Sequence, residues 1–517
     1  MAGSKTYYLT TPIYYVNDVP HIGHAYTTLA CDVLARFMRL DGYDVKFLTG
    51  TDEHGQKVEK SAQAAGVEPQ AFTDRVSQNF RDLVGVMNYS NDDFIRTTEP
   101  RHIKSVQALW TKLVEKGEIY LGSYAGWYSV RDEAFYGEDE LTTTPTGKKI
   151  APTGAECEWV EEPSYFFRLS AWQDRLIEFY EKNPDFIAPQ GKRNEVMSFV
   201  KSGLKDLSVS RTTFKWGIPV PGDDAHIMYV WLDALTNYIT AVGYPDTDSA
   251  DYTKYWPADL HMVGKDILRF HTVYWPAFLM AAGLQPPKRV FAHGWWTIEG
   301  QKMSKSLGNV IAPETLVGTY GLDQTRYFLL REVPFGNDGD FSHAAMVQRI
   351  NGNLANDYGN LVQRVLSMIG KNCGAKVPEH GEFTEADNRL LGAAHALLDV
   401  VRAEIRVQAF HKALDAIWAV IGDANRYVDE QAPWALKKTD PARMATVLYV
   451  LAETIRHLAI LTQPVMPDAS ARILEQLGQG ADDRGFGRLG PAGALKPGTD
   501  LPAPQGVFPR FVEEPKA

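Results

Sequence analysis

Residues 7–24 read YYLTTPIYYVNDVPHIGH, and this stretch decides the class of the fold. Residues 7–15, rich in aromatics and threonine, predict a buried strand. After a loop at 16–20 the pattern becomes helical from near His21, with one apolar face made of Leu29, Val33, Phe37 and Leu40. Residues 45–51 predict a second strand that ends at Asp52. A strand, a helix and a strand in this order predict an α/β fold built on a Rossmann-type parallel sheet.

His21 and His24 fall where the first helix begins. The amino end of a helix offers free N–H groups and a positive dipole to a phosphate, and such folds bind ligands beyond the carboxyl ends of their strands. Gly23 leaves room for a flat base to lie against the backbone. These residues therefore predict a nucleotide site, although two histidines beside a capping turn remain an alternative. The chain has no GxGxxG motif, which argues against a dinucleotide enzyme.

A second motif, Lys302-Met303-Ser304-Lys305-Ser306, lies far downstream, after a strand expected at 290–293. Gly300 and Gly308 bracket it and favour a hinged loop. Two ammonium groups on such a loop can neutralise the charge that grows on a departing pyrophosphate. The expected chemistry is charge stabilisation on ATP; the alternative for this segment is a solvated basic turn.

Length and composition limit the remaining possibilities. A chain of 517 residues needs several domains, and a net charge of -11 excludes a uniformly basic coat, so any RNA contact must be a local patch. No apolar run approaches the roughly 20 residues that span a bilayer, and the start has no signal peptide, which predicts a cytoplasmic protein. Cys31, Cys157 and Cys373 are too few for a disulfide framework or a thiolate-rich zinc site.

The two motifs, in this order, resemble those of class I aminoacyl-tRNA synthetases. Other segments narrow the resemblance to the methionyl-tRNA synthetases, from the first strand to about Pro467: Thr10-Thr11-Pro12-Ile13-Tyr14-Tyr15, Thr51-Asp52-Glu53-His54-Gly55, Tyr229-Val230-Trp231-Leu232-Asp233-Ala234, Gly264-Lys265-Asp266-Ile267 and residues 271–276. This resemblance implies ATP-dependent activation of L-methionine to methionyl-adenylate and its transfer to the 3' terminal ribose of methionine tRNA. It also implies that initiator and elongator tRNAs are both partners.

The resemblance implies a methionine pocket made of Ile13, Tyr15, Asp52, Trp231, Ala234, Tyr238, Ile267, His271 and Trp275. Asp52 would hold the substrate ammonium, aromatic walls suit a polarisable thioether, and Tyr15 and His271 can donate weakly to sulfur. Ordinary core packing is the alternative for the two tryptophans. Position 235 is Leu where some relatives have Pro. Homocysteine lacks only a methyl group, so binding alone cannot exclude it, and the resemblance implies its removal by cyclisation in the synthetic site.

For ATP, the resemblance implies that His21 and His24 contact the phosphates and that Gly23 lies under adenine. Gly264 and Asp266 would hold the ribose, and the backbone of Trp296 would pass near the base. Lys305 should meet the triphosphate, with Lys302 as the weaker catalytic candidate. Mg²⁺ is expected on the triphosphate, bound mainly by phosphate oxygens and water.

Residues 116–221 are expected to form a connective insert that divides the catalytic domain into residues 1–115 and 222–293. Many relatives build zinc knuckles there from CxxC pairs. This chain has Ser129 and Asp132 where one pair would fall, and Cys157 stands alone, so no structural zinc and no other protein-bound metal is expected. Residues 203–208 (GLKDLS) also match the family, with a plain surface loop as the alternative.

Residues 294–352 should form the loop and a stem-contact region, and residues 353–477 a helical anticodon-binding domain. Two apolar helix faces indicate the bundle: Phe410, Leu414, Ile417 and Ile421, and Leu448, Leu451, Ile455 and Leu458. The resemblance places anticodon contacts on Asn360, Arg364 and Trp434, where Trp434 can stack an unpaired base or, alternatively, anchor a helix end. Residues 478–517, rich in Gly, Pro and Ala, predict an extended tail, for which a path back along the body is one alternative. A monomer is expected, because the extra carboxyl-terminal domain of longer relatives has no room here.

Three rival functions remain. A class I synthetase for another apolar amino acid would carry a large editing insert, and this insert is short. A single-domain nucleotidyltransferase would leave the downstream loop and the bundle unexplained. A catalytically silent tRNA-binding paralogue is disfavoured by intact His21, His24, Asp52 and Lys305.

Overall fold

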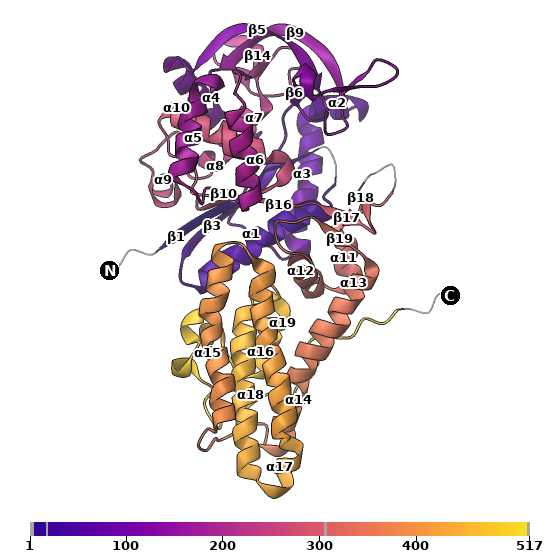
Figure 1. Cartoon of the computed structure of the whole chain (residues 1–517), viewed down its shortest axis with the longest axis vertical. Coiled ribbons are helices and arrows are strands. Elements are labelled where there is room, and N and C mark those ends of the chain that lie inside the picture. Colours follow the sequence, from indigo (N-terminus) through magenta and orange to yellow (C-terminus); the bar gives the residue numbers. More distant parts are fainter. Residues whose placement is uncertain (1–4, 17–18, 304–307, 514–517) are drawn as a thin grey trace. The chain divides into compact units, whose positions relative to one another are not determined.

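The computed structural model describes residues 5–16, 19–303 and 308–513 (Figure 1). It divides into two compact units. Of the described residues, the sheet unit comprises those within Thr6–Cys31 and Val45–His293, and the helical unit comprises Lys5, Asp32–Asp44 and those from 294 to 513.

The sheet unit is built on a seven-stranded sheet with the order β10-β16-β15-β1-β3-β2, and β4 pairs with β3. The strand pairs β1–β15, β15–β16, β10–β16, β2–β3 and β3–β4 all run parallel. This confirms the α/β fold. The strands are β1 (Thr6–Thr10), β2 (Tyr14–Tyr15), β3 (Asp44–Asp52), β4 (Asp93–Arg96), β10 (Ile187–Ala188), β15 (Leu260–Gly264) and β16 (Val290–His293).

The strand expected over residues 7–15 is split into β1 and β2. Pro12 stands in the gap, and proline has no N–H to donate to a ladder. The preceding residue, Thr11, still donates its N–H to Leu48 O at 3.0 Å. The break therefore re-aims the chain, so that Tyr15 pairs with Asp52 at the end of β3.

The helix expected from near His21 is α1 (Ile22–Leu40), and Leu29, Val33 and Phe37 on its apolar face are at most 3% exposed. The other helices of this unit are α2 (Gln56–Ala64), α3 (Pro69–Val86), α4 (Pro100–Glu115), α5 (Gln173–Lys182), α6 (Gln190–Lys201), α7 (Val230–Leu235), α8 (Asn237–Thr240), α9 (Ala250–Tyr255) and α10 (Trp275–Ala282), with η2 (Leu169–Trp172), η3 (Lys265–Ile267) and the π-helix η4 (Phe270–Tyr274).

Two long antiparallel strands, β5 (Ile119–Ser129) and β9 (Glu156–Phe167), dominate the segment expected as the insert (Figure 1). The smaller elements are β6 (Ala134–Tyr136), η1 (Glu138–Glu140), β7 (Thr142–Thr143), β8 (Lys149–Ile150), β11 (Leu207–Ser208), β12 (Ser210–Arg211), β13 (Pro219–Val220) and β14 (Asp223–Met228). Within this range β10 pairs with β16, so the chain returns to the main sheet between α5 and α6.

The helical unit contains a sheet of three short strands, β17 (Trp296–Ile298), β18 (Gln301–Lys302) and β19 (Gly339–Phe341). It continues as a helical bundle, as expected (Figure 1). Its helices are α11 (Pro313–Tyr320), α12 (Leu322–Arg331), α13 (His343–Gln348), the π-helix η6 (Arg349–Gly359), α14 (Asn360–Asn372), α15 (Glu385–Arg406), α16 (Phe410–Gln431), α17 (Pro433–Thr439), α18 (Pro441–Thr462), α19 (Pro467–Gln476), η7 (Ala481–Asp483), η8 (Phe486–Arg488) and η9 (Pro491–Gly493).

In the part of the chain that the structure describes, α18 is the one helix long and apolar enough to cross a membrane. Its apolar stretch is 94% buried, and it packs against α14, α15, α16, α17 and α19. It also carries a buried ion pair, Arg456 Nη2 to Glu453 Oε1 at 2.6 Å. These features are those of a bundle's core helix.

The segment after α19 folds back along the bundle. Val377 N donates to Thr499 O and Leu501 N to Ala375 O, each at 2.8 Å. On α18, the Arg456 guanidinium donates to Arg488 O at 2.7 Å, and the Leu495 N–H donates to the Glu453 carboxylate at 3.0 Å. The buried ion pair and this segment therefore satisfy one another's polar groups.

Candidate functional site

The carboxyl ends of β15 and β16 meet the first turns of α1. Gly264 at the end of β15 pairs with His293 at the end of β16, and His293 Nε2 lies 2.7 Å from Thr27 Oγ1 on α1. The expected ribose residue Gly264 and the expected phosphate residues His21 and His24 thus lie around one edge of the sheet. This is where open parallel sheets bind ligands.

The two histidines are locked to the start of α1 by backbone N–H groups. His21 N donates to His24 Nδ1 at 3.1 Å, and Gly23 N donates to His21 Nδ1 at 3.0 Å. Since each Nδ1 accepts, each neutral ring carries its proton on Nε2. Burial lowers the pKa of His24, and the neighbouring His21 lowers it further. At neutral pH His24 is therefore a neutral N–H donor, suited to a phosphate oxygen.

Gly23 also leaves room for the neighbouring His21 ring. A Cβ at this position would lie 2.9 Å from Cε1 of His21, so a side chain would displace the ring that folds back over the turn. At Gly264 a Cβ would lie 2.5 Å from Oδ1 of Asp266. The Asp266 carboxylate thus lies across the Gly264 backbone, where it can accept from a hydroxyl group.

The expected methionine residues gather in one buried aromatic region. Tyr238 Oη lies 2.6 Å from His271 Nε2, and His271 Nδ1 lies 2.9 Å from Ile267 O. A carbonyl only accepts, so Nδ1 carries the proton and Nε2 accepts from Tyr238. Burial lowers the pKa of His271 to about 4. The ring is therefore neutral with both nitrogens engaged, which differs from the expectation that His271 donates to sulfur in this state.

The remaining walls of this region are aromatic and aliphatic. Trp231 stacks on Phe270 with ring centroids 3.7 Å apart, and Tyr238 stacks on His261 at 4.0 Å. The Trp275 ring is wholly buried and its Nε1 donates to His261 Nε2 at 3.3 Å. Ala234 is buried on α7, and Ile13, Tyr15, Trp231 and Ile267 pack against the core cluster that contains Tyr238 and Trp275.

Asp52, at the carboxyl end of β3, is a buried acid at this site. Its Oδ1 has no hydrogen-bond partner among the described residues. Burial raises the pKa of Asp52, and the carboxylates of Asp233 and Glu133 raise it further. The carboxylate of Asp233 lies 2.6 Å from His54 Nδ1 and 2.7 Å from His102 Nε2. Burial raises the pKa of Asp233, but the two imidazoles outweigh this effect and lower it to about 2. Among the described residues, Asp52 Oδ1 thus has no counterpart of the imidazoles that bind Asp233, and an ammonium group could fill that role.

The downstream candidates belong to the helical unit. Trp296 is buried on β17 and packs against Phe328 with centroids 5.8 Å apart. Lys302 is exposed, and its Nζ lies 5.4 Å from the centroid of the Trp295 ring, a cation–π contact. Lys305 lies outside the described residues.

The anticodon candidates Arg364 and Trp434 are brought together from α14 and α17. The Arg364 guanidinium lies 5.7 Å from the centroid of the Trp434 ring and donates to Asp429 at 3.0 Å. Trp434 is 50% exposed, because Ala432 in a left-handed conformation and Pro433 turn the chain out of α16. Asn360 lies one turn before Arg364 on α14, and its Nδ2 donates to Asn356 Oδ1 at 3.3 Å. The three residues form an exposed patch with an aromatic face and polar donors.

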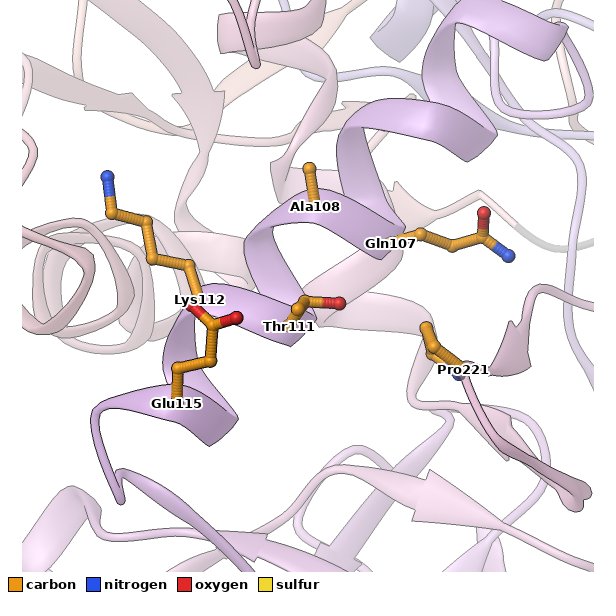
Figure 2. Close-up of a pocket in the computed structure, with 6 residues that line it drawn as sticks. All are labelled: Gln107, Ala108, Thr111, Lys112, Glu115 and Pro221. Atoms are coloured by element: carbon orange, nitrogen blue, oxygen red, sulfur yellow. The ribbon is translucent and has the colours of Figure 1, made fainter.

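A shallow pocket of about 530 Å³ lies elsewhere on the sheet unit. It is lined by Gln107, Ala108, Thr111, Lys112 and Glu115 of α4 and by Pro221 (Figure 2). None of the expected site residues lines it.

Comparison with known proteins decides the family. Residues 7–366 match the family model described as "tRNA synthetases class I (M)", and residues 377–517 match "Anticodon binding domain of methionyl tRNA ligase". The chain belongs to the methionyl-tRNA synthetases. The methionine–tRNA ligases of Mesorhizobium japonicum and Brucella suis are each 60% identical to it, covering 99% and 98% of both chains respectively.

Solved structures agree with this assignment. The Mycobacterium tuberculosis methionyl-tRNA synthetase in complex with methionyl-adenylate is 54% identical, with a TM-score of 0.96 over 98% of this chain and 100% of that one. The apo form of the same enzyme is 50% identical, with a TM-score of 0.90 over 99% of each. As a methionyl-tRNA synthetase, the chain catalyses ATP-dependent activation of methionine and its transfer to tRNA, and a synthetase for another amino acid is excluded.

Sequence reasoning missed two buried charged residues of this methionyl-tRNA synthetase. Glu133, in the turn between β5 and β6, accepts a hydrogen bond from Tyr15 Oη, and Arg211 on β12 lies within 5.3 Å of the ring centroids of Tyr128, Phe135 and Tyr229. Both come from the range expected as the insert, where no motif pointed to them. Arg211 follows three residues after the family-like GLKDLS segment (residues 203–208), which was the sequence feature closest to it.

Ser129 and Asp132, which stand where relatives have a CxxC pair, lie in a turn that hydrogen bonds hold in place. The Asp132 carboxylate accepts from Tyr136 Oη at 2.9 Å and from Thr153 Oγ1, and Asp132 N donates to Ser129 Oγ at 3.1 Å. Cys157 is buried on β9 nearby in the same sheet.

Among the described residues one group has metal-ligand geometry, His395, Glu453 and His457. Two of the three residues are already engaged by the protein: Glu453 binds Arg456, and His457 Nε2 accepts from Gly490 N at 2.8 Å. This arrangement is that of a structural cluster.

Proposed function

We propose that this synthetase binds methionine among Ile13, Tyr15, Asp52, Trp231, Ala234, Tyr238, Ile267, His271 and Trp275, with Asp52 holding the ammonium group. The observation that carries this assignment is a buried carboxylate, with one oxygen lacking a partner among the described residues, beside a buried aromatic cluster. A buried charge without a partner is costly, so the site favours a cationic ligand. The aromatic rings suit the thioether at the other end of that ligand.

ATP binding is proposed at His21, Gly23, His24, Gly264, Asp266, Trp296 and Lys305. The methionine carboxylate attacks the α-phosphorus, a P–O bond forms, and pyrophosphate leaves with the electrons of the broken bond. The Nε2–H groups of His21 and His24 donate to phosphate oxygens, while Lys305, with Lys302 as the weaker candidate, neutralises the leaving group. ATP enters with its Mg²⁺, whose ligands are phosphate oxygens and water.

In the second step a ribose hydroxyl of the terminal adenosine of tRNA attacks the adenylate carbonyl, and AMP leaves. Anticodon reading is proposed at Asn360, Arg364 and Trp434. Support comes from the exposure of Trp434 and the 5.7 Å contact with Arg364, because an exposed ring backed by a guanidinium can stack an unpaired base.

We also propose that the chain works as a cytoplasmic monomer, charges initiator and elongator methionine tRNAs, and binds no structural zinc. The hydrogen bonds around Asp132 support the last point, since they already tie the turn that a knuckle would hold. The proposed division is residues 1–115 and 222–293 for the catalytic domain, 116–221 for the insert, 294–352 for the loop region, 353–477 for the anticodon domain and 478–517 for the tail. Metal analysis of the purified chain tests the zinc proposal.

Exchange of labelled pyrophosphate into ATP tests the active site. Methionine should support exchange, whereas leucine, valine and cysteine should not. Absence of methionine-dependent exchange in the folded chain would instead favour a silent tRNA-binding paralogue. A variant such as Ala234→Trp should block the methionine pocket; unchanged methionine KM in that variant would contradict the proposed location.

A further inference from the structure

We propose that Glu133, carried by the insert, is a positioning residue for methionine: its carboxyl group holds the Tyr15 hydroxyl and thereby fixes that ring beside Asp52. The inference rests on the methionine site proposed above. It assigns to the insert a part in amino-acid binding.

Glu133 is delivered to the pocket by a specific backbone conformation. It lies between β5 and β6 with φ at 48°, in the left-handed region that residues other than glycine enter only where their surroundings enforce it. The residue is only 4% exposed. Its carboxyl group accepts a hydrogen bond from Tyr15 Oη, and the Tyr15 hydroxyl also lies 2.8 Å from His54 O. A residue of the insert thus reaches the strand that pairs with Asp52.

Gly55 provides an independent sign that this contact is built in. Its φ is 112°, and a Cβ there would lie 2.5 Å from both Tyr15 Oη and Glu133 Oε1. Any side chain at position 55 would therefore collide with both partners of the hydrogen bond. The glycine that ends the Thr51–Gly55 motif leaves room for the two side chains to meet.

The residue before Glu133 anchors the turn that aims it. Asp132 accepts from Tyr136, Thr153 and Arg131, the last through Nε at 3.1 Å. These bonds connect the β5–β6 turn to the turn before β9. Glu133 is therefore held by a hydrogen-bonded anchor on one side and by the Tyr15 hydroxyl on the other.

The second carboxylate oxygen of Glu133, Oε2, like Asp52 Oδ1, is buried without a hydrogen-bond partner among the described residues. Burial raises the pKa of Glu133 to about 7, while Tyr15 from β2 and Lys57 from α2, and to a lesser extent Arg211 from β12, lower it. Asp52 from β3 and Tyr128 from β5 also interact with this carboxyl group. An arriving ammonium favours the ionised form, so methionine binding should weaken as the pH falls through 7.

The test measures methionine and ATP KM by pyrophosphate exchange with the full chain. Glu133→Ala should raise methionine KM about tenfold and change ATP KM less than about twofold. Glu133→Gln keeps an acceptor for Tyr15 but lacks the charge, so at pH 8 its methionine KM should lie between those of Glu133→Ala and the unmodified chain. It should also reduce the rise in methionine KM between pH 8 and pH 6. Glu161→Gln, an exposed acid on β9, is the matched control and should match the unmodified chain.

A double-mutant cycle separates positioning from general damage. In a Tyr15→Phe background the hydroxyl is absent, so Glu133→Ala should raise methionine KM by less than about twofold more. Fully additive effects, or equal changes in methionine and ATP KM, would overturn the proposal. If Glu133→Ala does not fold, an unchanged pH profile in Glu133→Gln would overturn it instead.

Tyr15→Ala distinguishes failure of this inference from failure of the site. Unchanged methionine KM in that variant would refute the methionine pocket itself, and the inference with it. A raised KM in Tyr15→Ala, combined with no effect in Glu133→Ala, would refute only the role of Glu133.

Discussion

Tyr238 donates its hydroxyl proton to Nε2 of His271 across 2.6 Å, while the opposite nitrogen of that ring faces a backbone carbonyl. The pair fixes one neutral tautomer of a buried imidazole. The wall of the proposed methionine pocket is therefore uncharged, which suits an apolar thioether and disfavours a charged side chain.

Tyr238→Phe should weaken methionine binding. The change leaves His271 Nε2 buried without its donor, at a cost of about 1–3 kcal/mol, so methionine KM should rise about tenfold or more. ATP KM should stay constant. Steady-state exchange assays measure both constants, and an equal rise in both would argue for a general folding defect.

Asp52→Asn should lower kcat/KM for methionine by about 10- to 100-fold, because a charge-assisted bond to the ammonium contributes about 1.5–3 kcal/mol. Asp224→Asn, an exposed acid on β14, is the control and should leave the constants unchanged. The assay is pyrophosphate exchange over a methionine series. Retention of full activity in Asp52→Asn would remove this residue from the proposed site.

Lys305→Ala should reduce the rate of activation far more than methionine affinity. The proposed ammonium acts on charge that appears only in the transition state, so kcat should fall by about 100-fold or more with methionine KM nearly constant. Single-turnover adenylate formation gives the rate. A defect confined to methionine affinity contradicts this role.

Trp434→Ala should weaken tRNA charging and spare pyrophosphate exchange. Loss of one base–aromatic stack costs about 1–3 kcal/mol, which predicts a 5- to 100-fold rise in KM for tRNA, as an order of magnitude. Arg364→Ala should act in the same direction, whereas Arg389→Ala, at an exposed residue of α15 whose guanidinium donates to Glu385, should not. Equal losses in both assays would refute the anticodon assignment.

Stability should fall as the pH drops from 6.5 towards 4. Burial lowers the pKa of His457 and of His271 to about 4, so in this interval the unfolded chain binds more protons than the folded chain. Each group then removes up to about 1.4 kcal/mol per pH unit. Urea midpoints at pH 6.5 and 5 measure the slope. His457→Gln should flatten it, and an unchanged slope would show that this imidazole is not the titrating group.

The elements with strong periodicity could be predicted from sequence. The face of Leu29, Val33 and Phe37 predicted α1, because burying one stripe of a helix imposes that spacing. The strand expected at residues 290–293 corresponds to β16. The break at Pro12 was missed, since an apolar aromatic run reads as one strand unless the missing N–H is weighed.

The site was only partly accessible from sequence. His21 and His24 were suggested by their motif and their place at a helix start, and Asp52 by the family resemblance and its place at a strand end. Glu133 lies in no recognisable motif, and its position depends on a left-handed turn in the insert and on a long-range hydrogen bond with Tyr15. The hydrogen-bonding state of His271 was likewise hidden, because it is set by Tyr238 and a carbonyl that only the folded chain brings together.

The hydrogen bonds between α18 and the segment that follows the bundle have a practical consequence for engineering. Deleting residues from 488 onward would strip Arg456 of its carbonyl acceptors and Glu453 of the Leu495 amide, and would leave water to hydrate an ion pair in the middle of the bundle. A shortened version of the enzyme should thus lose cooperativity of unfolding before it loses any group that touches substrate. An affinity tag should therefore be added after this segment and should not replace it.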